Sequence, residues 1–408
     1  MSLIVFLILV AFVIALISVL YIPLPQNLAD RRKLQVLEML LRISNEYFGD
    51  LVEILFGTRV RNKLTRFLVG LPYMFQPKPP KWCTIKSEKI AGVKCRIYLP
   101  DKTRKTSDGL LVFVHGGGWC IMRPRFYDSV MYSLIARTGC TVVSIDYTLS
   151  PEVQYPYQIL ECQRVIETLY EEKHSEYGFN KEKIALLGDS AGGNLVAVLC
   201  QRLLKEGKQN YLKCQILIYP VIHALDFHSP SFQYYHQGYK GMAMLNPTQL
   251  ARFYLLYLGI EPTLKNMRDI TENAHLSPKL LESTKYKSLI DHSLLPESFF
   301  SNIEYEKTYK PSCNNELAEK FYKFATDSNF CAILGDNLKG LPPAMVLTCG
   351  IDILRDEGFL YTRRLQSFDV PTKWFHYENA THGHLNLPGS KQRKQMLDDI
   401  TAFVKCHL

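Results

Sequence analysis

The stretch Gly188-Asp189-Ser190-Ala191-Gly192 has the pattern G-x-S-x-G, in which one serine lies between two glycines. An apolar run over 184–187 precedes it, and a helix-forming stretch over 191–204 follows. A serine at the tip of a tight strand-to-helix turn has strained backbone angles, and side chains two positions away would collide with that turn. This context predicts that Ser190 is a nucleophile with the positive end of a helix directed toward it.

A second glycine-rich segment, His115-Gly116-Gly117-Gly118, ends the apolar run over 110–114. Acyl transfer at a serine passes through a tetrahedral oxyanion, which needs preorganised N–H donors about 3 Å away. Glycines let the backbone come that close because they carry no side chain. We therefore expect the oxyanion hole in the segment His115 to Gly117, with the amides of Gly116 and Gly117 joined by that of Ala191.

A serine nucleophile also needs a base and an orienting acid, which follow it along the chain in the order acid, then histidine. Asp352 ends a late apolar strand-like run, whereas its rival Asp356 falls within the next helical stretch, where an acidic residue is stabilising anyway. His382 and His384 share the last loop between a strand and a helix, so that one is expected to be catalytic and the other structural. We predict a triad of Ser190, Asp352 and His382.

Short apolar runs recur along the chain with helical intervals between them, at 110–114, 141–145, 184–187, 216–219 and 344–348. Such runs are typical of a mostly parallel sheet that helices cover on both faces, which is an α/β architecture. This pattern of apolar runs is not continued between Val221 and Gly340. The stretch is too long for a loop, and we interpret it as an inserted helical cap. The predicted division is an apolar anchor over 1–22, a helical cap segment over 23–80, a first core part over 81–220, the cap insertion over 221–340 and a second core part over 341–408.

The N-terminus carries no charged residue from Ser2 to Ile22. As a helix, that many residues would span about 30 Å, the thickness of a hydrocarbon core, and predict a transmembrane anchor. A cleaved signal peptide is the alternative, but its apolar part would be shorter and would end at a small-residue cleavage site. The basic triplet Arg31-Arg32-Lys33 favours a cytoplasmic body under the positive-inside rule, while the glycosylation triplet Asn379-Ala380-Thr381 favours the opposite side.

The formal net charge of +9 comes from Lys and Arg that are spread along the chain, which indicates a basic surface rather than a nucleic-acid footprint. The 11 cysteines form no C-x-x-C pair, so that no zinc site is expected. A serine triad supplies its own nucleophile and base, and we predict neither a metal nor an organic cofactor.

The motifs H-G-G-G-W, G-D-S-A-G-G-N, D-x-L-R-D-E-G and a late H-G together resemble the hormone-sensitive lipase group of α/β-hydrolases. The apolar N-terminus and Cys120, which follows Trp119, are similar to its arylacetamide deacetylase-like branch. The resemblance implies an α/β-hydrolase fold with a helical cap over an apolar acyl pocket, and the same triad and oxyanion segment. It also implies a single-pass type II anchor in the endoplasmic reticulum membrane with a lumenal body, and a disulfide between Cys120 and Cys349.

Two positions depart from the family pattern. The family's Y-R-L-A-P-E stretch has Thr148 in place of its arginine, which puts the local ion pairing in doubt. His384 replaces a common phenylalanine, and a glycan on Asn379 would crowd the predicted base.

The predicted function is a membrane-anchored serine hydrolase that cleaves a lipophilic ester or amide through an acyl-enzyme on Ser190. The alternatives are a catalytically silent protein that binds a small molecule on the same fold, and a structural membrane protein. An intact set of triad residues favours the enzyme. The natural substrate, the choice between ester and amide, and the oligomeric state are left open.

Overall fold

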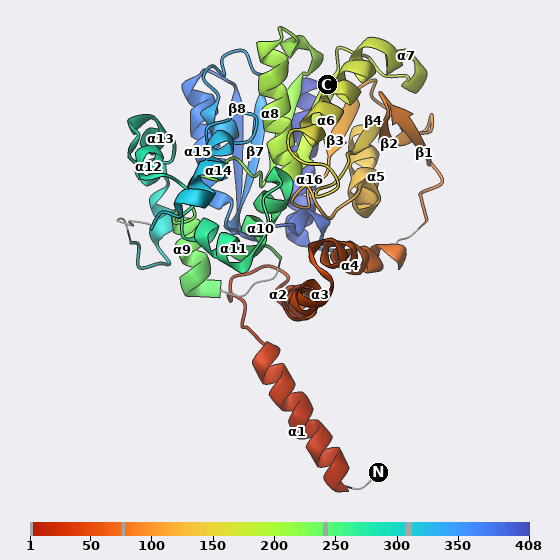
Figure 1. Cartoon of the computed structure of the whole chain (residues 1–408). Helices are drawn as coiled ribbons and strands as arrows, with labels where there is room; N and C mark the ends of the chain where they lie inside the picture. The colour runs from red at the N-terminus through yellow and green to blue at the C-terminus, as the bar shows by residue number, and fades with distance from the viewer. Residues whose placement is uncertain (1–2, 76–77, 240–243, 307–311) are drawn as a thin grey trace.

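A computed structural model describes residues 3–75, 78–239, 244–306 and 312–408, without the side chains of residues 15–20 and 75. Its centre is an eight-stranded sheet of order β1-β2-β4-β3-β5-β6-β7-β8 (Figure 1). Only β2 is antiparallel to its neighbours, and all other pairs are parallel. The strands are β1 Cys83–Ile90, β2 Val93–Pro100, β3 Leu110–Val114, β4 Thr141–Asp146, β5 Ile184–Asp189, β6 Cys214–Ile218, β7 Ala344–Ile351 and β8 Thr372–Thr381. The mostly parallel sheet predicted from the apolar runs is confirmed.

Alternate residues of the central strands pack on opposite faces of the sheet, because side chains along a strand point to alternate sides. In β3, Leu111 and Phe113 contact the layer of helices α5 Asp128–Thr138 and α16 Lys391–His407. Val112 and Val114 lie on the other face, where α6 Tyr157–Thr168, α8 Ala191–Lys205 and α15 Arg355–Ser367 cover the sheet. Since both faces are buried, the strands read as continuous apolar runs in the sequence.

The first two strands of the chain, β1 and β2, form a hairpin. Ala91 and Gly92, with φ of 48° and 81°, form the two-residue turn that pairs β1 with β2. Two successive positive φ values match the turn geometry that suits a twisted hairpin.

Helices surround the carboxyl ends of the parallel strands and form the cap (Figure 1). One group precedes the sheet in the chain: α2 Arg31–Arg42, α3 Gly49–Phe56 and α4 Thr58–Gly70. A second group lies between β6 and β7: α9 Pro230–Tyr234, α10 Pro247–Leu258, α11 Leu264–Thr271, α12 Pro278–Glu282, α13 Thr284–Leu289 and α14 Asn315–Ala325.

The N-terminal helix α1 covers Leu3–Leu20 and extends away from the body (Figure 1). Within the part of the chain that the structure describes, no helix meets the length and apolarity required to cross a membrane. The transmembrane span predicted over 1–22 is therefore not found, and its first two residues lie outside the described residues.

The glycines of the turn between β5 and α8 allow the helix to approach the strands closely. A Cβ on Gly192 would lie 2.1 Å from the Val114 carbonyl oxygen, and one on Gly188 would lie 2.5 Å from the Gly192 carbonyl oxygen. Neither position can accept a side chain without moving backbone. The steric reason given for these glycines from the sequence is confirmed.

We expect Gly192→Ala to lower the free energy of unfolding by about 3 kcal/mol, since backbone rather than a flexible side chain must shift. The matched control is Gly70→Ala at the end of α4, where the nearest atom, in the Phe126 ring, is 3.4 Å from the new Cβ. That change should alter stability by about 1 kcal/mol or less. Urea unfolding of both variants checks this, and equal stabilities would contradict it.

Candidate active site

Ser190 occupies the turn between β5 and α8 with φ 54° and ψ −122°. A non-glycine residue at positive φ is strained and persists only where its surroundings hold it. Here the Ser190 N–H donates to the Ile218 carbonyl at 2.9 Å, and the Ser190 carbonyl accepts from Val221 and Asn194 at 3.2 and 3.1 Å. The end of β6 and the first turn of α8 thus hold the strained turn from both sides.

His382 bridges Ser190 and Asp352. Its Nε2 lies 2.9 Å from the Ser190 Oγ, and its Nδ1 lies 2.8 Å from the Asp352 Oδ2. The geometry fits an imidazole that donates from Nδ1 to the carboxylate and accepts the serine proton at Nε2. Asp352 is held by the Leu354 N–H at 3.0 Å, and the Tyr219 ring packs against His382 with centroids 4.8 Å apart.

Three neighbouring elements position these groups. Ser190 follows β5, Asp352 follows β7 and His382 follows β8, and β7 and β8 are paired in the sheet. The carboxyl ends of parallel strands meet at one edge, which brings together residues that are up to 192 positions apart.

The rival residues Asp356 and His384 have structural contacts instead. Asp356 accepts hydrogen bonds from the Ser231 N–H at 2.6 Å and from Arg355 at 2.7 Å, which ties α15 to the start of α9. His384 is fully buried, with its Nε2 2.8 Å from the Ser390 Oγ at the start of α16. The structure therefore brings Asp352 and His382, and not their rivals, to the serine.

In the glycine-rich segment after β3, the free amides lie one residue later in the chain than predicted. The Gly116 N–H donates to the Asp189 Oδ1 at 2.8 Å, so it cannot also serve an oxyanion, and its assignment as a donor is wrong. Gly117 and Gly118 follow at φ 91° and 55°. In the part of the chain that is described, the amides of Gly117, Gly118 and Ala191 donate no hydrogen bond.

His115 shapes this segment from within. Its ring stacks on Tyr147 with centroids 4.2 Å apart, and its Nδ1 donates to the Gly116 carbonyl at 2.9 Å. Complete burial lowers the pKa of His115 to about 3 and keeps the ring neutral. His115 thus supports the loop that carries the free amides and offers no donor of its own.

Asp189 joins the glycine-rich segment to the nucleophile turn, a role that the sequence did not reveal. Besides the Gly116 amide, its carboxylate accepts from the Tyr127 hydroxyl at 2.9 Å. Burial raises the pKa of Asp189 to about 6, although both hydrogen bonds oppose the shift. Its place next to Ser190 was a possible signal for this role, whereas Tyr127 had none.

Asp189 should make stability depend on pH. Its folded pKa exceeds the unfolded value of 3.8, so the folded state binds the proton more tightly, and stability declines as the pH rises toward 6. Asp189→Asn keeps an acceptor for Gly116 and removes the titration. Between about pH 4 and pH 6 the wild type should lose about 2–3 kcal/mol of unfolding free energy relative to this variant. Urea unfolding at several pH values measures this, and parallel curves would refute it.

The family's arginine is absent at Thr148, and an arginine of helix α4 makes the local ion pair here. Arg66 of α4 binds both oxygens of Glu152 at 2.7 Å and donates to the carbonyls of Ser150 and Cys120. Thr148 itself donates through its N–H and hydroxyl to Glu161, at 2.6 and 2.9 Å. Arg66 therefore fastens the N-terminal cap helices to the loop after β4.

The disulfide implied between Cys120 and Cys349 is absent, and both residues are buried free thiols. Cys120 follows β3 and Cys349 lies in β7, and strands β5 and β6 lie between these two strands. The distance from β3 to β7 is therefore roughly 14 Å across the sheet. A disulfide needs Cα atoms within about 7 Å of each other. In addition, Cys120 packs with Trp119 on one face of the sheet, and Cys349 packs with Tyr377 on the other. The prediction failed because it rested on resemblance without the strand order.

Asn379 is exposed near the end of β8, where its backbone carbonyl accepts from the Ala29 N–H at 2.8 Å. Its side chain is therefore accessible to a modifying enzyme. Ala380 and Thr381 of the same triplet are buried.

A cavity of about 340 Å³ lies between the N-terminal helices and α10. Ile121 and Phe253 line it, and both also contact the glycine-rich segment: the Ile121 N–H donates to the Gly117 carbonyl at 3.0 Å, and a Cβ on Gly118 would lie 2.3 Å from the Phe253 ring. The cavity is therefore adjacent to the free amides.

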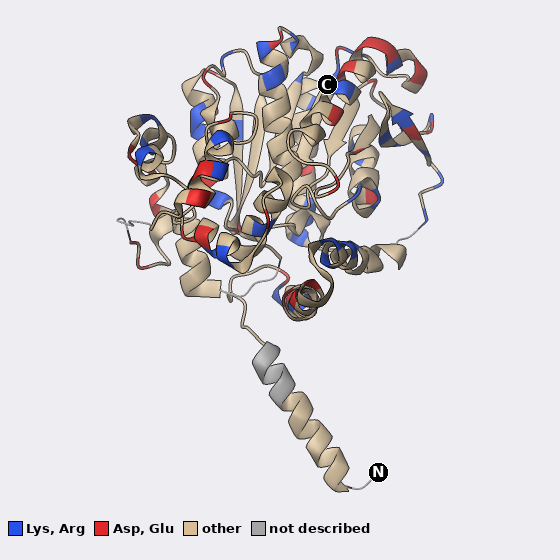
Figure 2. Ribbon diagram, viewed as in Figure 1, with Lys and Arg blue, Asp and Glu red and all other residues tan. Residues whose placement is uncertain are grey.

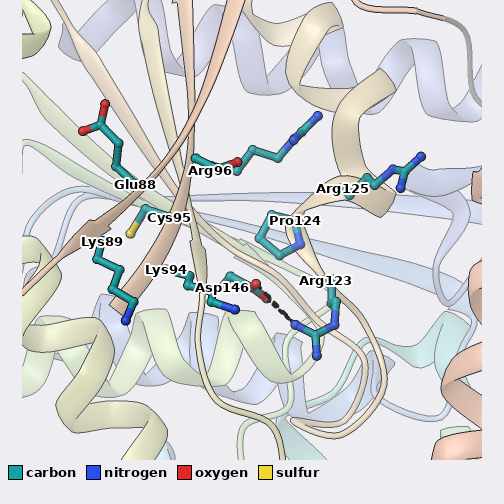
Figure 3. A pocket seen from close by; sticks show the side chains of 10 residues that line it. Glu88, Lys89, Lys94, Cys95, Arg96, Arg123, Pro124, Arg125 and Asp146 are labelled. Atoms are coloured by element: carbon teal, nitrogen blue, oxygen red, sulfur yellow. Dashed lines mark hydrogen bonds and ion pairs between the residues drawn. The ribbon is translucent and has the colours of Figure 1, made fainter. Parts of the chain in front are cut away.

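A second pocket of about 360 Å³ lies over the β1–β2 hairpin (Figure 3). Five cations line it, of which Arg123 pairs with Asp146 at 3.3 Å and Arg96 with Asp128 at 2.7 Å. Neither the triad nor the glycine-rich segment and its contacts Ile121 and Phe253 belong to it, which separates it from the proposed reaction site. Among the described residues, no group of three or more His, Cys, Asp or Glu side chains could hold a metal ion.

Comparison with known proteins agrees with the fold. The chain matches the family described as alpha/beta hydrolase fold over residues 111–288 and 299–386. It is 32% identical to arylacetamide deacetylase of Rattus norvegicus, over 91% of this chain and 92% of the relative, and 29% identical to neutral cholesterol ester hydrolase 1 of Bos taurus, over 89% and 88%.

Solved structures of esterases share the fold. An esterase of Pyrobaculum calidifontis superposes with a TM-score of 0.61 at 22% identity, covering 85% of this chain and 92% of that one. An arylesterase superposes with a TM-score of 0.60 at 25% identity, covering 94% and 98%. The chain is a carboxylic ester hydrolase and belongs to the α/β-hydrolase family, in the arylacetamide deacetylase-like branch of the hormone-sensitive lipase group.

Proposed function

We propose that the chain hydrolyses lipophilic carboxylic esters or arylacetamides through an acyl-enzyme on Ser190. The observation that carries this proposal is the continuous hydrogen-bond chain from Ser190 through His382 to Asp352, at 2.9 and 2.8 Å. A serine hydroxyl is a weak nucleophile by itself, and a base within hydrogen-bond reach activates it.

In the first step the Ser190 Oγ attacks the carbonyl carbon while His382 accepts the serine proton at Nε2. Asp352 stabilises the resulting imidazolium through the Nδ1–H bond. The carbonyl oxygen becomes an oxyanion, for which Gly117, Gly118 and Ala191 offer amides that have no other acceptor among the described residues. His382 then protonates the leaving alcohol or amine, and the acyl group stays on Ser190.

In the second step a water molecule gives a proton to His382 and attacks the acyl carbon. The same amides stabilise the second oxyanion, and the proton returns from His382 to the Ser190 oxygen as the acid leaves. No metal or organic cofactor takes part in this scheme.

The substrate class rests on the relatives and on the cavity beside the glycine-rich segment. The matched relatives bear the names of an arylacetamide deacetylase and a neutral cholesterol ester hydrolase, which name an aryl-substituted amide and a sterol ester as substrates. The cavity adjoins the proposed oxyanion donors and has Ile121, Phe253 and Tyr235 in its wall. A lipophilic acyl or alcohol group fits these side chains, whereas Glu46, Asp50, Arg61 and Arg252 give another part of the cavity a charged wall.

We expect Ser190→Ala to lower kcat/KM for an acyl ester by about 10⁴-fold or more, because the nucleophile is lost while the fold remains. A fluorophosphonate probe should label the wild type and leave the variant unlabelled. Labelling of the variant to the same extent, or no labelling of folded wild type, would refute the assignment. The second result would instead favour a silent ligand-binding protein on this fold.

We further propose that α1 anchors the chain in the endoplasmic reticulum membrane, as a single-pass protein with its body in the lumen. Helix α1 has no charged residue, and its described side chains from Leu3 to Val10 are exposed apolar groups. Eighteen helical residues rise about 27 Å, and the uncharged Tyr21 and Ile22 extend the apolar segment. Asn379, in the single acceptor triplet of the sequence, is proposed to carry a glycan.

For this topology, the body should resist protease added to intact microsomes and should be digested once detergent is present. Removal of N-glycans should increase the gel mobility of the wild type and leave Asn379→Gln unchanged. Digestion in intact microsomes would contradict the lumenal orientation. Release of the protein by alkaline carbonate would contradict the anchor.

A further inference from the structure

Exposed large hydrophobic side chains are concentrated in the N-terminal cap helices. Among the described residues beyond α1 and Tyr21, they are Val36, Leu40, Ile43, Tyr47, Phe48, Leu51, Ile54, Leu55, Phe56, Val60, Phe67 and Met74 in this region, against Tyr157, Leu160, Leu264, Leu294 and Tyr322 in the rest of the chain. Soluble proteins scatter such residues singly, and a concentration of them marks an interaction site.

The concentration follows one side of a continuous helical segment. Helix α2, the π-helical residues Ile43–Phe48 and α3 run without a break from Arg31 to Phe56. Val36, Leu40, Ile43, Tyr47, Leu51 and Ile54 succeed one another at intervals of three or four residues, which places them on one face. We name these six residues, with Leu55 and Phe56, the outer face of α2–α3.

Some charged residues of this segment point into the protein, although Arg32 and Lys33 at its start are exposed. Glu38 and Arg42 are buried and form an ion pair, and Glu53 pairs with the buried Arg252 of α10. Ile54, by contrast, is 81% exposed and Phe56 is 64% exposed. A helix on a protein surface in water normally turns its apolar side inward and its charges outward. This segment buries the Glu38–Arg42 ion pair together with Leu34 and Val52, and it leaves the outer face exposed, which suits an apolar surrounding.

Cations border the outer face. Arg32, Arg59 and Lys63 are exposed, and Figure 2 shows Lys and Arg along α4. Aromatic side chains, Tyr47, Phe48 and Phe56, lie on or beside the face. Apolar and aromatic residues with flanking Lys and Arg are typical of helices that lie in the interface of an anionic bilayer. Helix α1 also leaves the body on the side of α2 and α3 (Figure 1).

We propose that the outer face of α2–α3 lies in the lipid interface as a second membrane contact, so that the body rests on the bilayer. A second copy of the chain fits the face less well, because a twofold contact would bring the cations of both copies together. The cavity lined by Asn45, Asn62 and Phe253 lies directly behind α3 and α4. The proposal includes a path for a lipophilic substrate from the bilayer through this cavity to the proposed oxyanion donors.

The test places a tryptophan in the full-length chain as a probe of depth. Ile54→Trp is compared with Cys406→Trp, an exposed position at the C-terminal end of the chain, which lies at the far side of the body from α1 (Figure 1). Both variants and the wild type are reconstituted in phosphatidylcholine vesicles with a minority of phosphatidylserine, with and without brominated phosphatidylcholine. Brominated lipid should quench the emission of the new tryptophan at position 54 by about half and leave that at position 406 unchanged.

Equal and small quenching at both positions in vesicle-bound protein would overturn the proposal. So would a dimer, detected by chemical crosslinking in the vesicles, that shields position 54 from the lipid. The quenching of tryptophan emission requires no catalysis, so its result is independent of the proposed hydrolase activity.

An activity comparison, which does rest on the proposed function, tests the path from the bilayer. The double variant Ile54→Ser, Phe56→Ser should hydrolyse a long-chain ester embedded in vesicles about tenfold more slowly than the wild type. Its rate on a soluble acetate ester should equal that of the wild type, which also shows that it is folded. Equal rates on the embedded ester would remove the functional part of the proposal.

Discussion

The turn between β5 and α8 holds Ser190 at φ 54°, and the rest of the site depends on how that strain is maintained. Strain of this kind costs about 1–3 kcal/mol, so it survives only where other contacts fix the backbone. The ends of β6 and β3 supply them: the Ile218 carbonyl accepts from Ser190, and Gly192 packs against the Val114 carbonyl. Asp189 also holds the glycine-rich segment in place, because its carboxylate accepts hydrogen bonds from the Gly116 amide and the Tyr127 hydroxyl. Nucleophile and proposed oxyanion donors thus form one rigid unit.

Much of this arrangement could be predicted because it is local in the sequence. A glycine two positions from Ser190 on each side is a steric requirement of the turn, and the order of acid and histidine follows from the order of the strands. The parallel sheet could also be predicted, because strands that are buried on both faces are continuous apolar runs in the sequence. Asp352 was found because it directly follows such a strand, and His382 because it lies in the last loop between a strand and a helix.

The errors concern groups whose partners are distant in the chain. The Gly116 amide is occupied by Asp189, 73 residues later, which moves the proposed donors to Gly117 and Gly118. The pairing of Cys120 with Cys349 ignored the two strands between them. Arg66, which binds Glu152 86 residues away, had no signal in its own neighbourhood. A helical cap segment was expected over 23–80, but the sequence did not show that Val36, Leu40 and Ile54 face outward.

The central claim is that Ser190 attacks a carbonyl whose oxygen then moves toward Gly117, Gly118 and Ala191. A crystal structure of the enzyme inhibited by an alkyl phosphonate tests it most directly, since the phosphoryl group imitates the tetrahedral intermediate. The account predicts a covalent bond from the Ser190 Oγ to phosphorus, with one phosphoryl oxygen about 3 Å from those three amides and the Gly116 amide still on Asp189. A bond to another residue, or an oxygen bound by Gly116, would contradict it.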